Sequence, residues 1–151
     1  MSTMFNSILV VCVGNICRSP LAEGLFKLQF QSQAGGNAPE VISAGIHALT
    51  GHPPDPMTIR IADKLGADIR RHRARQLTDQ LLDWAELVLV MEDWHREEVF
   101  GLSLSSRGKT YTLGHWNEEQ ILDPYRRSVD VYINTARQIR SAVIHWSEKL
   151  C

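Results

Sequence analysis

The chain has 151 residues, of which 44% are hydrophobic and 22% charged, and it carries a net charge of −1 at pH 7. Its length suits one domain with one core, so we expect residues 1–151 to form a single domain. The balanced charge argues against a nucleic acid or an anionic membrane as partner, and the longest apolar run, residues 8–13, is too short to span a membrane. No basic residue precedes that run, which argues against a signal peptide, and we expect a cytoplasmic protein.

Apolar runs and helical periodicities alternate along the chain. The expected elements are, in chain order, a strand at 6–12, a helix from Ser19, a loop at 33–39, a strand at 40–44, a helix at 55–66, a strand at 85–91, a helix at 92–100, a strand at 109–113 and a helix from Ser128. Alternation of this kind is typical of α/β proteins. We therefore expect one three-layer domain in which helices flank a four-stranded parallel sheet.

Ser19 and Pro20 mark the expected start of the first helix. Serine is a good N-cap, and proline fits the first helical position because the missing N–H has no partner there anyway. Leu21, Leu25 and Leu28 recur at helical spacing and predict the apolar face of this helix.

The segment between the first strand and this helix reads Cys-Val-Gly-Asn-Ile-Cys-Arg-Ser, residues 12–19. In open α/β folds ligands bind at the carboxyl ends of the strands, and the free N–H groups of a helix N-terminus favour an anion there. Arg18 adds a planar guanidinium that suits two phosphate oxygens at once. We expect a phosphate-binding loop between the first strand and the first helix, made by Val13, Gly14, Asn15, Ile16, Cys17, Arg18 and Ser19.

Cys12 lies at the base of this loop. The positive field that binds a phosphate also stabilises a thiolate, and a thiolate beneath a bound phosphoryl group is positioned for in-line attack. The Cys-x5-Arg spacing alone does not separate this hypothesis from a buried strand-end cysteine followed by a surface arginine. The order of strand, glycine-containing turn, Arg18, Ser19-Pro20 and helix favours the catalytic interpretation.

Residues 10–23, Val-Val-Cys-Val-Gly-Asn-Ile-Cys-Arg-Ser-Pro-Leu-Ala-Glu, resemble the active-site loop of the low-molecular-weight protein tyrosine phosphatases. The resemblance covers nearly the whole chain, and its further motifs are Ser43-Ala44-Gly45, Arg73-Ala74-Arg75-Gln76, Met91-Glu92 and Asp123-Pro124-Tyr125. The residues Gly114-His115-Trp116 point to the proteobacterial members that act beside tyrosine kinases of capsule or exopolysaccharide export. The resemblance implies a protein-tyrosine-phosphate hydrolase that works through a phosphocysteine, without a cofactor, on such an autophosphorylated kinase.

A leaving oxygen needs a proton, so a carboxylic acid must face the loop. The sequence has two Asp-Pro pairs: Asp55 precedes a helical pattern and is explained as its cap, whereas Asp123 stands in a predicted loop. The resemblance assigns the general acid to Asp123, which would then act as the base for the hydrolytic water.

The resemblance also implies supporting roles. It expects Asn15 to be held by a network of Ser19, Ser43 and His72, and the Ser19 hydroxyl, besides capping the helix, to bond the sulfur of the nucleophile. Asn15 also tolerates the left-handed backbone that a tight loop requires.

Two residues are expected to flank the pocket. By resemblance Tyr125 walls its entrance, although an exposed turn aromatic remains an alternative. Leu49 stands in the opposite wall, at about the place where eukaryotic members often carry an aromatic residue.

Other readings stay open for Cys17 and for the arginines between Arg70 and Arg75. Cys17 is either the partner of a reversible disulfide with the nucleophile, as the family permits, or a small apolar filler. A solvated face is favoured over an anion site for the arginines.

Three other functions share parts of this pattern. A thioredoxin-coupled arsenate reductase of the same fold needs two further cysteines, and the chain has none between Cys17 and Cys151. A phosphocysteine carrier of a sugar phosphotransferase system needs neither Arg18 nor a distant acid, and a non-catalytic phosphotyrosine-binding module needs neither nucleophile nor acid. The spacing of the cysteines and histidines shows no metal-ligand set, so we expect no metal.

Overall fold

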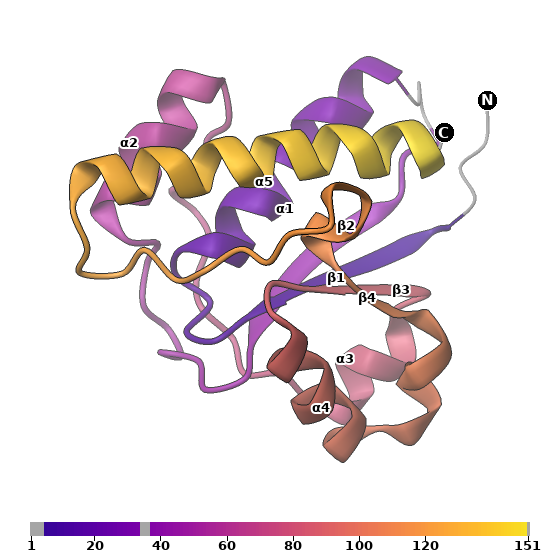
Figure 1. The fold of residues 1–151 in the computed structure, drawn as a ribbon. Coiled ribbons are helices and arrows are strands. Elements are labelled where there is room, and N and C mark those ends of the chain that lie inside the picture. Colours follow the sequence, from indigo (N-terminus) through magenta and orange to yellow (C-terminus); the bar gives the residue numbers. More distant parts are fainter. Residues whose placement is uncertain (1–4, 34–36, 151) are drawn as a thin grey trace.

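The computed structural model describes residues 5–33 and 37–150, and its centre is a parallel four-stranded sheet (Figure 1). The strands are β1 (Ser7–Cys12), β2 (Glu40–Gly45), β3 (Leu87–Val90) and β4 (Thr110–Thr112), in the spatial order β2-β1-β3-β4. Strand β1 pairs with β2 from Ser7 opposite Glu40 to Cys12 opposite Gly45, so both strands end at the same edge of the sheet. The predicted parallel sheet is confirmed, and the predicted loop at 33–39 falls partly outside the described residues, at 34–36.

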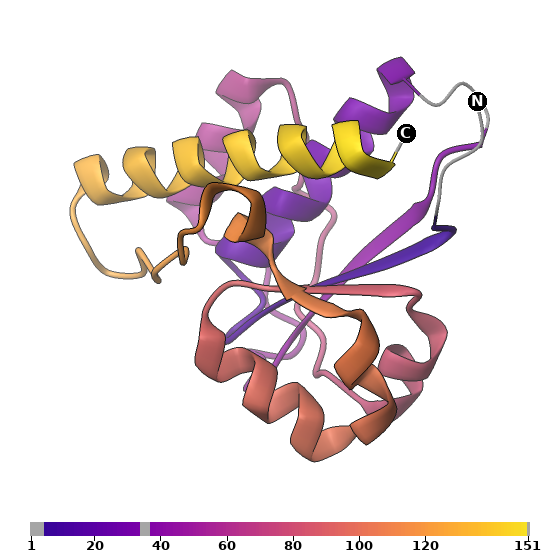
Figure 2. The ribbon, with the colours of Figure 1, turned by 45° about the vertical axis from the view of Figure 1, so that its right-hand side comes forward.

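Helices cover both faces of the sheet, as Figures 1 and 2 show. Helices α1 (Arg18–Gln33), α2 (Pro56–Leu65) and α5 (Val129–Leu150) lie on one face, and α3 (Asp79–Trp84) and α4 (Asp93–Leu102) lie on the other. Alternate residues of β1 enter the two cores because successive strand side chains point to opposite faces. Ile8 and Val10 join the α1–α5 core, and Leu9 and Val11 join the core beneath α3 and α4. The predicted three-layer arrangement is confirmed.

Helix α2 begins and ends where the sequence predicts. The Asp55 carboxylate accepts a hydrogen bond from the Thr58 backbone N–H at 3.3 Å, and Pro56 occupies the first turn. Gly66 ends the helix with φ of 90°, a left-handed conformation that glycine adopts without strain. Asp55 is therefore a helix cap, as expected.

Helix α1 differs from the expectation in two ways. It begins at Arg18, so Ser19 lies inside the first turn, and the prediction that Ser19 is the N-cap is wrong. Leu28 is 38% exposed, whereas Leu21 and Leu25 are buried as predicted. Phe26 and Phe30 are buried as well, so the apolar face is rotated from the predicted one.

The short elements carry little periodicity and were not predicted. They are α3 and the two 3-10 helices η1 (Leu104–Lys109) and η2 (Leu113–Asn117). Helix α3 is capped by Thr78, whose hydroxyl oxygen accepts the Leu81 N–H at 3.2 Å.

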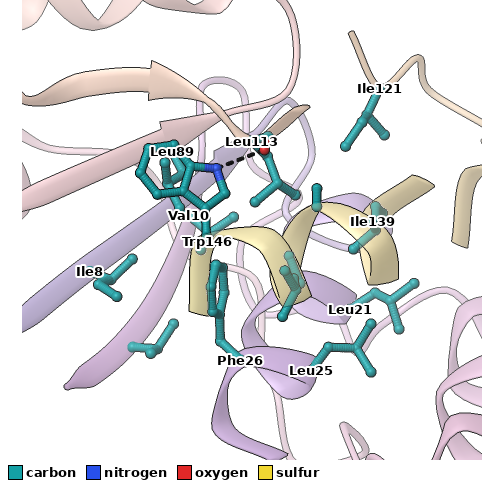
Figure 3. Packing of buried hydrophobic residues seen from close by; sticks show 14 of the residues in the cluster. Ile8, Val10, Leu21, Leu25, Phe26, Leu89, Leu113, Ile121, Ile139 and Trp146 are labelled. Atoms are coloured by element: carbon teal, nitrogen blue, oxygen red, sulfur yellow. Dashed lines mark hydrogen bonds between the residues drawn. The ribbon is translucent and has the colours of Figure 1, made fainter. Parts of the chain in front are cut away.

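Trp146 of α5 fixes the end of β4 against the helical layer (Figure 3). Its indole N–H donates to the carbonyl oxygen of buried Leu113 at 2.7 Å. Further along the chain, the backbone N–H of buried Ile121 bonds the carbonyl oxygen of Met91 at 2.9 Å. The segment that precedes Asp123 is therefore anchored to the core at two points. In the described part of the chain, no helix combines the length and the apolar character that crossing a bilayer demands.

Candidate active site

A pocket of about 200 Å³ opens where β1 ends and α1 begins. Most of the residues predicted for the site line it, and they come from three separate stretches of the chain. The lining residues are Cys12, Val13, Gly14, Ile16, Cys17, Arg18, His47, Leu49, Asp123 and Tyr125. His47 was not predicted, and Asn15 and Ser19 lie below the lining, where both are fully buried.

The sulfur of Cys12 lies 2.9 Å from the hydroxyl oxygen of Ser19. That oxygen also accepts a hydrogen bond from the Asn15 side-chain amide at 2.8 Å. With a lone pair engaged by the amide, the hydroxyl proton is available to the sulfur. The Ser19 hydroxyl is therefore engaged by the Cys12 sulfur and by Asn15, and it does not cap the helix end.

Asn15 holds the loop in shape. Its φ of 60° is left-handed, a conformation that asparagine tolerates better than most residues. The two protons of its side-chain amide go to Ser19 and to Ser43, the latter at 3.0 Å, and its side-chain oxygen accepts the Arg75 backbone N–H at 2.9 Å. Its backbone carbonyl accepts from His72 Nε2 at 2.8 Å. The predicted network of Ser19, Ser43 and His72 around Asn15 is thus present in the geometry.

Glu23 closes this network, and sequence reasoning gave it no role. The Ser43 hydroxyl donates to Glu23 Oε1 at 2.6 Å, and His72 Nδ1 lies 4.0 Å from the same oxygen. Glu23 is the last residue of the motif at 10–23, so the sequence did single it out. Its contact with Ser43 is visible only in the folded structure.

Arg18 is the largest fully buried side chain of the site, with 1% of its side chain exposed. Its Nη1 donates to Glu92 Oε2 at 2.7 Å and to the carbonyl oxygen of Ile121 at 2.8 Å. Its Nη2 lies 3.8 Å from Asp123 Oδ2. One guanidinium therefore joins the loop to the chain after β3 and to the segment that carries Asp123.

Behind Glu92, His95 is fully buried. Its Nδ1 accepts the backbone N–H groups of Met91 and Glu92, both at 3.2 Å, so the neutral ring carries its proton on Nε2. That nitrogen lies 3.5 Å from Glu92 Oε2. Burial and, to a smaller extent, the nearby Arg18 guanidinium lower the pKa of His95 to about 4, although the carboxylates of Glu92 and Asp123 act in the opposite direction.

Asp123 stands at the mouth of the pocket, with 47% of its side chain exposed. Its Oδ1 accepts the Tyr125 backbone N–H at 3.0 Å, which leaves Oδ2 directed toward Arg18. A carboxyl group so placed faces both the loop and water, as a group that gives and takes protons must.

Comparison with known proteins agrees with this geometry. The chain matches the family described as low molecular weight phosphotyrosine protein phosphatase over residues 7–151. The chain belongs to this family. Etp, a low molecular weight protein-tyrosine-phosphatase of Escherichia coli K12, is 37% identical over 147 residues, which cover 97% of this chain and 95% of Etp.

Solved structures of the family have the same fold. The tyrosine phosphatase Wzb from Escherichia coli K30, in complex with sulphate, has a TM-score of 0.89 at 38% identity, covering 97% of this chain and 99% of Wzb. The YwlE arginine phosphatase from Geobacillus stearothermophilus has a TM-score of 0.85 at 30% identity, covering 95% of this chain and 91% of YwlE.

The pocket wall of this phosphatase is tied to its phosphate-binding loop. The backbone N–H of Leu49 donates to the carbonyl oxygen of Gly14 at 3.0 Å. Gly45 stands between the two segments, and a Cβ at this position would meet the carbonyl oxygen of Val13 at 2.5 Å. A side chain at 45 would therefore push the loop and the wall apart. Leu49 and Tyr125, 40% and 39% exposed, both line the pocket.

Cys17 is buried beside Ile16, Ala74 and Tyr132. Burial raises the pKa of its thiol, and the carboxylate of Asp55 raises it further. Cys17 is therefore held as a thiol in the resting loop, in contrast to the polar setting of Cys12. The described cysteines, Cys12 and Cys17, are both free.

The arginines between Arg70 and Arg75 are exposed. Arg70 pairs with Asp63 and, at 3.2 Å, with Asp68, and Arg73 donates to the backbone carbonyl of His72 at 2.7 Å. These contacts agree with the solvated face that the sequence analysis favours. The described residues contain no group of three or more His, Cys, Asp or Glu side chains that could hold a metal ion.

Proposed function

We propose that the protein hydrolyses phosphotyrosine in proteins through a phosphocysteine on Cys12. The observation that supports this most is the convergence of Cys12, Arg18 and Asp123 on one pocket, with Asp123 Oδ2 3.8 Å from Arg18 Nη2. These residues supply a nucleophile, a fixed positive charge and a proton donor, which together are what phosphoryl transfer to a thiolate requires.

In the first step the loop N–H groups and Arg18 bind the phosphate dianion. The Cys12 thiolate attacks phosphorus in line with the tyrosyl oxygen, so the S–P bond forms as the P–O bond breaks. Asp123, protonated at this stage, donates its proton to the departing phenolic oxygen.

In the second step Asp123 is a carboxylate and accepts a proton from water. The water oxygen attacks phosphorus, the S–P bond breaks, and inorganic phosphate leaves. The Ser19 hydroxyl, 2.9 Å from the sulfur, stabilises the thiolate that is released. Asp123 is then protonated again, and the cycle is closed without a metal or a cofactor.

The proposed substrate is an autophosphorylated tyrosine kinase of polysaccharide export. This part follows from the similarity to the proteobacterial phosphatases and from the residues Gly114-His115-Trp116. The proposal also assigns the enzyme to the cytoplasm, where a thiol nucleophile stays reduced.

The test uses p-nitrophenyl phosphate, a phosphotyrosine peptide and a phosphoarginine peptide. We expect Cys12→Ser to abolish turnover while keeping phosphate affinity. We expect Asp123→Asn to lower kcat by about 10²–10⁴-fold for phosphotyrosine, and much less for p-nitrophenyl phosphate, whose leaving group needs no proton.

Asp55→Asn is the matched control, because it alters the other Asp-Pro pair and asparagine still caps a helix. Full activity of Cys12→Ser, or an equal loss in Asp55→Asn and Asp123→Asn, would contradict the mechanism. Faster turnover of phosphoarginine than of phosphotyrosine would contradict the substrate class. Recovery of a tyrosine kinase on immobilised Cys12→Ser protein tests the partner.

A further inference from the structure

A groove of about 570 Å³ lies between helices α2 and α5, which cross near the orange end of α5 in Figures 1 and 2. Its floor is apolar and comes from residues about one helical turn apart on each helix. These residues are Met57, Ile61 and Leu65 of α2 and Val129, Ile133 and Ala136 of α5. Val129 and Ile133 are 51% and 37% exposed, so the floor is open to water at the α5 side.

The rim of this groove is basic. Its charged residues are Arg60 and Lys64 of α2 and Arg137 and Arg140 of α5, all exposed, and no acidic residue lines it. None of the four forms an ion pair or a side-chain hydrogen bond with another described residue, in contrast to Arg70, which pairs with Asp63 and Asp68. This concentration of unpaired positive charge stands out in a chain whose net charge is −1.

The groove starts beside the active-site pocket. The backbone N–H of Asp55, the cap of α2, donates to the carbonyl oxygen of Ile16 in the phosphate-binding loop at 2.9 Å. Tyr125, at the mouth of the pocket, precedes the first groove residue of α5, Val129, by a short turn. From Met57 to Leu65 the groove follows α2 for about 12 Å, the length of two helical turns.

Charge and shape together define the occupant. A second copy of this chain, seated by two-fold symmetry, would bring the same four cations face to face. A lipid bilayer offers negative charge, but its flat surface would not fill the groove between the two helices. An amphipathic helix would place its apolar side chains on the apolar floor, and its acidic flanking residues would form ion pairs with the basic residues of the rim.

We propose that the α2–α5 groove is a second binding site for the phosphoprotein substrate, and that it holds an acidic amphipathic segment of that protein while the phosphotyrosine enters the pocket. This inference rests on the proposed function and extends it, because it gives the enzyme a means of choosing a protein that the small pocket alone does not provide. Binding energy from the groove would lower KM for such a substrate and leave the turnover of a small aryl phosphate unchanged.

The experiment compares two synthetic phosphotyrosine peptides. Each carries, behind a flexible Gly-Ser linker, an amphipathic helix of about 14 residues, enough to cover the groove. One helix has glutamates on its polar face, and its twin has glutamines at the same positions. We expect the wild type to prefer the acidic peptide by about tenfold in kcat/KM at low salt, and to lose most of this preference at high salt.

The variant Arg137→Glu/Arg140→Glu should lose the preference and keep wild-type turnover of p-nitrophenyl phosphate. The matched control is Arg107→Glu/Lys149→Glu, which makes the same change in net charge at two exposed residues that contact aromatic rings away from the groove. The control should keep the preference.

Equal turnover of both peptides by the wild type overturns the proposal, as does an equal loss of preference in the control variant. Binding to vesicles of phosphatidylglycerol, or dimerisation, that only the groove variant loses would assign the groove to a membrane or to a second copy and overturn it too. If neither phosphotyrosine peptide is hydrolysed, the proposed function fails. The groove is then tested by the fluorescence anisotropy of the two unphosphorylated peptides, where the same preference is expected.

Discussion

Glu92→Gln isolates the charge that Glu92 supplies to the buried Arg18. The substitution keeps the shape of the side chain and one acceptor oxygen, but it removes the negative charge 2.7 Å from Arg18 Nη1. Only 1% of the Arg18 side chain is exposed, so water does not replace the lost partner. We therefore expect Glu92→Gln to destabilise the folded enzyme.

The size of the expected loss in stability follows from the buried ion pair between Arg18 and Glu92. Removing one member of a buried ion pair costs about 3–5 kcal/mol. Asp123, with its Oδ2 3.8 Å from Arg18 Nη2, remains as a second carboxylate, and the glutamine oxygen retains a hydrogen bond. We therefore expect a loss of about 2–3 kcal/mol in the free energy of unfolding, which for a domain of this size lowers Tm by about 5–10 °C.

Urea unfolding at pH 7 measures this loss, first without phosphate and then with saturating phosphate. A bound dianion supplies Arg18 with a new counter-charge, so the difference between Glu92→Gln and wild type should shrink when phosphate is present. Glu97→Gln is the control, because Glu97 is exposed on α4, the helix that follows Glu92, and makes no ion pair with a described residue. A Glu92→Gln enzyme as stable as wild type without phosphate would refute this account of the buried charge.

Two further predictions follow from the site. His95 has a pKa of about 4 in the folded protein, below that of an unfolded histidine. Between about pH 6.5 and 4 the unfolded chain therefore binds a proton that the folded protein does not. The free energy of unfolding falls as the pH drops through that window. His95→Gln should flatten that part of the stability–pH curve, by up to about 3 kcal/mol in urea unfolding, and an unchanged slope would contradict a neutral buried His95. Asn15→Gly and Asn15→Ala should both lower kcat/KM, because both lose the bonds to Ser19 and Ser43. Only Asn15→Ala must also bear the left-handed φ of 60°, so it should be about 1 kcal/mol less stable than Asn15→Gly, and equal stability would argue against backbone strain.

Sequence patterns predicted the sheet and the long helices because these elements bury regular apolar faces. The strand at 6–12 appears as Ser7–Cys12, and Asp55-Pro56 and Gly66 mark the two ends of α2. The short helix α3 escaped prediction because six residues carry too little periodicity.

Cys12, Arg18 and Asp123, which line one pocket, were identified from the sequence because each stands in a motif whose residue types suit phosphoryl transfer. The contacts of Glu92 and His95 were not predicted, although Met91-Glu92 is among the family motifs, since the Arg18–Glu92 contact joins residues 74 positions apart and depends on β3 lying next to β1. For Ser19 the local pattern predicted a helix cap, and the family resemblance also predicted a bond to the Cys12 sulfur; of these two contacts the structure has the second. Local sequence patterns predict contacts between neighbouring residues of one element, whereas these contacts depend on how the elements pack in the fold.

The Asn15 network has a consequence for inhibition. Both amide protons, the side-chain oxygen and the backbone carbonyl of Asn15 have partners within the protein itself, so contacts that need no anion hold the loop in its shape. A preformed loop loses little entropy on binding, and we expect it to bind a tetrahedral oxyanion whether or not a tyrosine is attached. If the proposed mechanism holds, we expect inorganic phosphate, its product, to compete with substrate for the same loop. The rate of dephosphorylation should thus respond to the phosphate level around the enzyme, with no separate regulatory site.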